Sequence, residues 1–378
     1  MQRPAGIRWP RVAAVAVVAV CLAYAPIAAT ELWSYADPGA PAPGQWLLAR
    51  AVDPPYVAQA LATRIGPYRH SLAAMVVHSV LGGALMVLGP VQLLSALRRR
   101  PRLHRATGVV FAVTVYASMA AAGVYLARTA PADAFGGAAF WIVLATILVG
   151  TVLSTTFGVL AAATRFPDLH QRWLLLCYGY LMTAPLLRLE WGALPVLLPG
   201  LPMAEVNRVA LMHLGSLVVL GALLASRALD RRATVAGVQG SWVPRPVLVG
   251  TGLLGLLALA LIADRMLGLG ATGRRLLLAY LLPYLACYAL LLVRRHRDTA
   301  AGRPWAREEW GLHLAALSLA PVLSAALAPL LGHALRLDRL TAWSAAVAVG
   351  CGVAAFATTA VVALRLMYAR ELLKGASR

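Results

Sequence analysis

The sequence predicts an all-α fold, a polytopic transmembrane helix bundle of about ten spans, and three observations support this prediction. Of the 378 residues, 61% are hydrophobic and only 13% are charged, about half the charged share of soluble domains. About ten apolar runs reach the roughly 18 residues that a spanning helix needs. The alternating polarity typical of membrane β-barrel strands is not seen. The lipid bilayer is therefore the expected surroundings of most of the chain.

The expected spans follow one another between charged or Pro- and Gly-rich breaks. Arg3, Arg8 and Arg11 precede the first apolar stretch, over 12–29, which is longer than the ~7–15 apolar residues of a cleaved signal peptide. It is therefore expected to be a retained signal anchor. The spans lie at about 11–30, 72–96, 105–127, 137–163, 173–190, 207–228, 246–266, 274–293, 310–333 and 341–364.

The distribution of basic residues predicts the orientation. With the N-terminus in the cytoplasm and ten alternating spans, 23 of the 34 Lys and Arg residues fall inside. The positive-inside rule therefore predicts that both termini are cytoplasmic. The 23 comprise three before residue 12, five over 98–105, two over 165–172, four over 227–245, five over 294–307 and four over 365–378.

Four regions are expected: a signal-anchor span over 1–36, an extracytoplasmic loop over 37–70, a five-helix region over 71–228 and a four-helix region over 229–378. The many prolines between residues 37 and 56 argue against a long helix there. The stretch 191–202 is also Pro-rich and expected outside.

The composition also excludes some classes of partner and site. The net charge of +20 lies in short loops between apolar runs rather than on one face, so no nucleic-acid partner is expected. The four cysteines lie inside apolar runs and form no CxxC, so neither a disulfide nor a zinc site is expected; they are Cys21, Cys177, Cys287 and Cys351.

Histidines are the main candidates for chemistry, because ionisable groups at membrane depth are costly. The predicted orientation places His78 and His213 at similar depth near the outer face, and His104 and His170 at the inner boundary. Two histidines at matching depth on facing helices could ligate haem b iron, with a quinone or redox partner; no other metal is expected. Small residues near them could admit the haem edge, or could serve close helix packing instead; they are Gly82, Gly83, Gly89, Gly108 and Gly215.

Two other classes of function stay open. A transporter or lipid-handling protein would use Arg105, Arg172 and Arg188 with the histidines to bind an anionic group. A non-catalytic scaffold or assembly factor would use the same residues only for stability. Arg188 and Glu190 are two residues apart and face different sides of a helix, so each is expected to use a partner elsewhere.

Tyr280, Tyr284 and Tyr288 recur every four residues, and helix packing is favoured for them over a quinone or substrate path. The Walker-A, HExxH, GxSxG and CxxCH motifs are absent from the sequence.

Between about residues 70 and 190 the chain resembles the bacterial membrane family of domain of unknown function 2306 (DUF2306). The resemblance implies a multi-pass protein of the bacterial cytoplasmic (inner) membrane and no particular activity. One departure is that Leu174–Leu176 follow Trp173, where the family usually has Met and then Arg. The layout is also loosely similar to two-haem b561-type cytochromes, at the level of fold alone. The matching elements are His78 with its Gly-rich helix, Gly89-Pro90-Val-Gln92, Leu103-His104-Arg105-x-x-Gly108, His170-x-Arg172-Trp173 and Leu187-Arg188.

Overall fold

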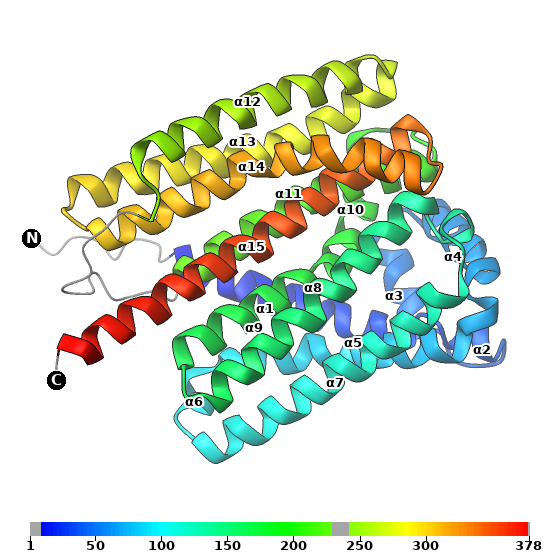
Figure 1. Ribbon diagram of the computed structural model, residues 1–378. Coiled ribbons are helices and arrows are strands. Elements are labelled where there is room, and N and C mark those ends of the chain that lie inside the picture. The colour runs from blue at the N-terminus through cyan, green and yellow to red at the C-terminus, as the bar shows by residue number, and fades with distance from the viewer. Residues whose placement is uncertain (1–8, 229–241, 377–378) are drawn as a thin grey trace, which may run out of the picture. The chain divides into compact units, whose positions relative to one another are not determined.

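The computed structural model describes residues 9–228 and 242–376, and the regular structure in these ranges is entirely helical (Figure 1). The all-α prediction is therefore confirmed for this part of the chain. The helices divide into two compact units, which we call the N-terminal unit (residues 1–129) and the C-terminal unit (residues 130–378).

Eight helices in the described ranges are long and apolar enough to cross a membrane, and they coincide with eight of the ten expected spans. The expected fifth span is divided between α9 (Pro167–Leu181) and α10 (Thr183–Leu197), each of which is short. The expected sixth span coincides with α11 (Met203–Ala228), which is not among the eight, and its side chains after Gly215 lie outside the described residues. The eight run over Ala14–Ala36, Pro54–Leu93, Pro101–Arg128, Gly137–Ala163, Arg245–Leu267, Gly270–Ala300, Pro304–Ala334 and Arg339–Glu371.

Three long helices build the N-terminal unit, with α5 packed against both α1 and α7. Gly83 permits the close approach of α5 to α1, because an added Cβ would lie 2.7 Å from the carbonyl oxygen of Ala25. The short helices between residues 33 and 68 gather at one end of this unit (Figure 1). In chain order its elements are α1 (Trp9–Thr30), α2 (Trp33–Ala36), α3 (Pro43–Ala51), α4 (Pro54–Tyr68), η1 (Arg69–Ser71), α5 (Leu72–Leu93), α6 (Ser95–Arg98) and α7 (Pro101–Arg128).

The expectation that prolines prevent a long helix between the first two spans is wrong, because Pro54–Leu93 runs as 40 helical residues. Pro54 and Pro55 occupy the first turn, where a backbone N–H has no helical partner to lose. Asp53 caps this turn, its carboxylate accepting from the backbone N of Tyr56 at 3.2 Å. The Pro-rich stretch that begins at Trp191 is likewise helical as far as Leu197.

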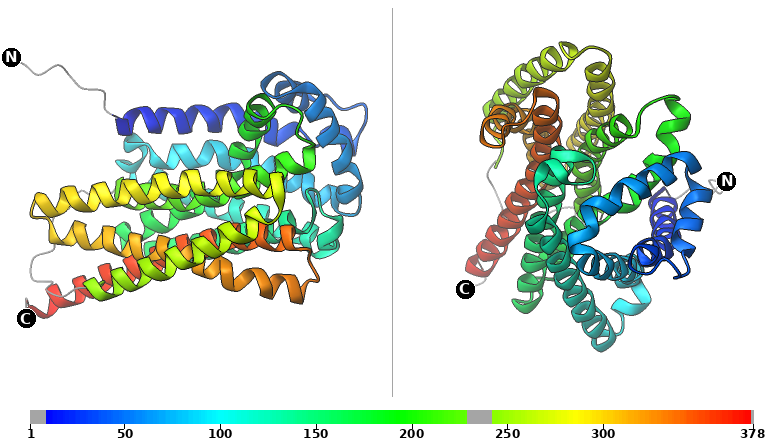
Figure 2. Two further views of the ribbon diagram at one scale, coloured as in Figure 1. Left: turned by 90° about the horizontal axis from the view of Figure 1, so that it is seen from above. Right: turned by 90° about the vertical axis from the view of Figure 1, so that its right-hand side faces the viewer.

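The C-terminal unit is a bundle in which α14 packs against α12, α13 and α15 (Figure 2). In the same unit, α11 packs against α13 and α15. Its crossings also use glycines: a Cβ at Gly255 would collide with the carbonyl oxygen of Ser318, whereas one at Gly252 would meet nothing within 4 Å. Besides α9–α11, its elements are η2 (Pro131–Asp133), α8 (Gly137–Ala163), α12 (Arg245–Leu267), α13 (Gly270–Ala300), α14 (Pro304–Ala334) and α15 (Arg339–Ala376).

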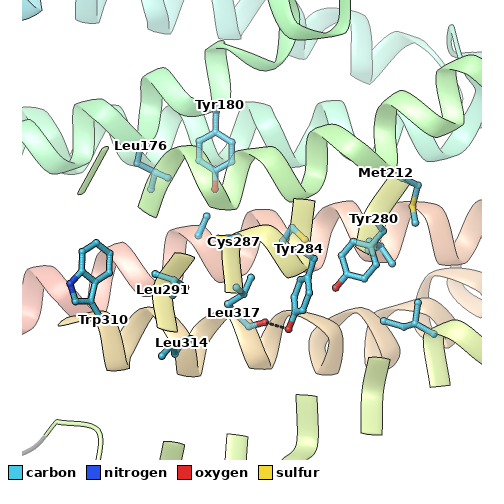
Figure 3. Close-up of a cluster of buried hydrophobic side chains, with 14 of the residues drawn as sticks. Leu176, Tyr180, Met212, Tyr280, Tyr284, Cys287, Leu291, Trp310, Leu314 and Leu317 are labelled. Atoms are coloured by element: carbon cyan, nitrogen blue, oxygen red, sulfur yellow. Dashed lines mark hydrogen bonds between the residues drawn. The ribbon is translucent and has the colours of Figure 1, made fainter. Parts of the chain in front are cut away.

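The core of this unit is formed by side chains of α8, α9 and α11–α15, part of which Figure 3 shows. Tyr280 and Tyr284 are buried, and the hydroxyl of Tyr284 donates to the carbonyl oxygen of Leu317 at 3.0 Å. Tyr280 and Tyr284 therefore pack in the core, and Tyr284 makes an interhelical hydrogen bond of the kind that the favoured interpretation expected. The four cysteine side chains of the protein are also buried.

Candidate functional site

His78 lies on α5 and is held by Ser118 on α7. Its Nδ1 is 3.0 Å from the Ser118 carbonyl oxygen and 3.0 Å from the Ser118 hydroxyl. A carbonyl can only accept, so Nδ1 carries the proton in this bond. The Ser118 hydroxyl is also placed to donate to the His78 carbonyl, at 3.3 Å. In the neutral ring, Nε2 then carries the lone pair that a metal ion would use.

Two histidines of the C-terminal unit show the same arrangement. Nδ1 of His170 on α9 is 2.9 Å from the carbonyl oxygen of Gly158 on α8. Nδ1 of His213 on α11 is 2.7 Å from Oε1 of Glu190 on α10. Both partners are acceptors, so both rings donate through Nδ1, and in the neutral ring Nε2 then carries the lone pair. The side chain of His213 is 38% exposed, whereas that of Glu190 is 10% exposed.

His104 lies in the first turn of α7 and is partly exposed. The expected pairs, His78 with His213 and His104 with His170, each draw on both units, so the pairing stays a prediction.

The donor chemistry fits haem iron, but only part of the expected room for a haem edge is present. Gly82 has nothing within 4 Å of an added Cβ, and at Gly108 the nearest atom, from Gln92, is 3.9 Å away. The space beside Gly83 and Gly215 is instead occupied by neighbouring helices: a Cβ at Gly215 would lie 2.9 Å from Cα of Ala348. These two glycines serve helix packing. Within the described ranges, no three His, Cys, Asp or Glu side chains gather as a metal site of their own.

The middle of α10 is joined to α11 by polar contacts. Besides the His213–Glu190 bond, Nε1 of the fully buried Trp191 donates to Oδ1 of Asn207 at 3.0 Å. The guanidinium of Arg188 lies over the Trp191 ring, 4.5 Å from its centroid. Arg188 and Glu190 thus use different partners, as their spacing predicted. The second oxygen of Glu190, Oε2, is buried and has no hydrogen-bond partner among the described residues.

A buried charge cluster that the sequence did not indicate joins α9, α14 and α15; we define it as Arg172, Glu308, Glu309 and Arg365. Arg172 Nη1 lies 3.0 Å from Glu309 Oε1, with side chains only 5% and 0% exposed. Arg365 Nη2 lies 2.8 Å from Glu308 Oε2, and Arg365 Nη1 lies 4.0 Å from Glu309 Oε2. Arg365 also stacks over the Trp305 ring at 3.4 Å.

This cluster changes the interpretation of Arg172, which was expected to bind an anion or lipid. Its charge is matched by Glu309 inside the bundle, which makes it less suited to hold a headgroup. The one available signal was the adjacent pair Glu308–Glu309 near the start of an apolar helix, in a chain with only 14 acidic residues. Arg105, by contrast, is exposed.

The N-terminal unit has a second buried ion pair that the sequence did not indicate. Arg64 Nη1 on α4 lies 3.5 Å from Oε2 of Glu31, just beyond α1, with side chains 2% and 5% exposed. Gln45 of α3 donates to the Glu31 carbonyl at 2.9 Å. These contacts fasten the short helices to the end of α1.

The long apolar helices, with a buried ion pair in each unit, define a multi-pass α-helical membrane protein. Residues 75–226 match a family described as "Predicted membrane protein (DUF2306)", which confirms the resemblance from residue 75 to about 190 and extends it to residue 226. The matched segment contains His78, His104, His170 and His213. No curated protein and no solved structure that was compared matches the chain.

Proposed function

We propose that this protein binds b-type haem through histidine Nε2 atoms and carries electrons within or across a bacterial cytoplasmic membrane. The observation that supports this is common to His78, His170 and His213: each ring donates Nδ1–H to an acceptor on a neighbouring helix of its own unit. Metal-ligating histidines are typically held in this way, since the bond fixes the tautomer and aims Nε2. Haem would supply a one-electron iron couple, and a quinone or redox protein would exchange the electron.

The acceptors differ in what they do to their rings. The carbonyls of Ser118 and Gly158 orient His78 and His170 with a neutral dipole. The carboxylate of Glu190 adds negative charge beside His213, which makes that imidazole a stronger electron donor. His213 is therefore the ring best suited to stabilise an oxidised iron.

A pigment spectrum tests the proposal directly. We expect the full chain, produced with haem supplementation and purified in neutral detergent, to show the absorption bands of b-type haem in a reduced-minus-oxidised spectrum. His78→Ala, His170→Ala and His213→Ala should each lower the haem content, because each removes a positioned Nε2. His296→Ala and His333→Ala are matched controls, since both rings are exposed, and should leave the spectrum unchanged.

A flat spectrum from folded protein would contradict haem binding. If the three substitutions in the colourless protein then changed only its stability, the scaffold hypothesis would be favoured. If they changed the binding of an anionic ligand instead, the transporter or lipid-handling hypothesis would be favoured.

The proposal includes a topology of ten spans with both termini in the cytoplasm, in which α9 with α10 forms the fifth span and α11 the sixth. The basic asymmetry supports it. We expect alkaline phosphatase fused after Gly200 to be active, and a fluorescent protein fused after Gly302 or Arg378 to fluoresce. A fusion after Gly200 that is inactive while a fluorescent one is bright would show that α9–α11 do not cross.

A further inference from the structure

The turn between α5 and α7 concentrates positive charge in the N-terminal unit. Five arginines fall within eight residues, and all five side chains are exposed. We call this segment, residues 98–105, the arginine turn. α7 begins within it at Pro101, and no side chain caps that helix end. The first-turn N–H groups and the helix dipole therefore add to the positive field of Arg98, Arg99, Arg100, Arg102 and Arg105.

These charges have no acidic counterpart nearby in the chain. No Asp or Glu occurs between Asp53 and Asp133. Two arginines of the C-terminal unit, by contrast, are matched by acids: Arg365 by Glu308 at 2.8 Å and Arg370 by Asp168 at 2.9 Å. Within the described residues, no ion pair involves the five arginines of the turn, so their charge is available to an external anion.

Apolar side chains accompany the charges. Leu94 is 53% exposed and Leu103 is 46% exposed, on either side of the consecutive arginines. Basic side chains beside exposed leucines at the end of a spanning helix match both parts of a phospholipid, the anionic headgroup and the upper acyl chain. A free phosphate would use only the arginines, and a nucleic acid would leave the leucines uncovered.

We propose that the arginine turn is a docking site for anionic phospholipids of the membrane leaflet that it faces. Several guanidinium groups share the headgroup phosphates, and Leu94 and Leu103 lie against the acyl chains. The site uses none of the acceptor bonds that hold His78, His170 and His213. His104 lies within the turn, and the test below leaves it in place.

Lipid retention tests this proposal on the full chain. In neutral detergent, native mass spectrometry with added phosphatidylglycerol should show tighter binding than with phosphatidylcholine. Near a membrane surface each arginine contributes about fivefold in binding, so removing three should weaken phosphatidylglycerol binding by about a hundredfold. The variant is Arg99→Gln, Arg100→Gln, Arg102→Gln. The control is Arg294→Gln, Arg297→Gln, Arg307→Gln, which removes the same charge from exposed positions of the other unit.

The expected result is a large loss in the first triple variant and little change in the second, with equal midpoints of thermal unfolding. An equal loss in both would show a general charge effect and overturn the assignment to this turn. The absence of any preference for phosphatidylglycerol would also overturn it. If inorganic phosphate at the same concentration displaced the lipid, the lipid assignment would be overturned, and the turn would be a site for a soluble anion.

Discussion

Glu309→Leu alone is expected to destabilise the C-terminal unit by about 3–5 kcal/mol, the typical cost of leaving a buried charge without its partner. Glu309 is fully buried, and its removal leaves the Arg172 guanidinium, only 5% exposed, without the carboxylate 3.0 Å away. Arg365 keeps its bond to Glu308. The thermal unfolding midpoint in neutral detergent should therefore fall sharply, with earlier loss of helical circular dichroism.

The double variant Arg172→Leu, Glu309→Leu is expected to recover most of that loss. Removing both charges leaves two apolar side chains inside the bundle, and such replacements of buried pairs are often neutral or stabilising. Asp168→Leu is the control, because its pair with Arg370 is 42% and 30% exposed and should be worth less than about 1 kcal/mol. A double variant as unstable as the single one would mean that the cluster is needed for something other than charge neutralisation.

Hydropathy was sufficient to predict eight spans, because a helix satisfies its own backbone hydrogen bonds and only its length and polarity need to match the bilayer. The expectation from proline content failed between residues 54 and 68, and the reason is local. The prolines there stand in the first turn of α4, where they favour the helix, and their number alone could not show this. The division of the fifth span at Met182 also left no mark in the hydropathy, since both halves are apolar.

The partners of the charged residues were less predictable than the residues themselves. Glu190 and Arg188 could be singled out from the sequence because they are ionisable residues in a predicted span. Their two-residue spacing on a helix predicted that they would use separate partners. Arg172 and Glu309, however, are 137 residues apart, and Arg365 and Glu308 are 57 apart. No local rule relates positions so distant; only the packing of α9, α14 and α15 brings them together. The histidines were found from sequence, whereas the acceptors that fix their tautomers required the structure.

The N-terminal unit offers a second, independent test of a buried charge. Arg64→Ala is expected to destabilise it by about 3–5 kcal/mol, because Glu31, 5% exposed and 3.5 Å away, loses its counter-charge within the folded end of the unit. The loss should be local: amide hydrogen exchange over residues 43–68 should accelerate, as α3 and α4 are fastened at this point by Gln45 and Arg64.

Arg69→Ala is the matched control for this prediction. It follows in the next helical turn but its side chain is exposed, so its removal should leave exchange over the same residues almost unchanged. A second variant, Arg64→Leu with Glu31→Leu, removes both charges and should restore most of the protection. Equal acceleration in Arg64→Ala and Arg69→Ala would show that basic charge in general, rather than the buried pair, holds α3 and α4. Rescue by the double variant would show that this end of the unit requires filled volume and no unpaired buried charge, and does not require the two ions themselves.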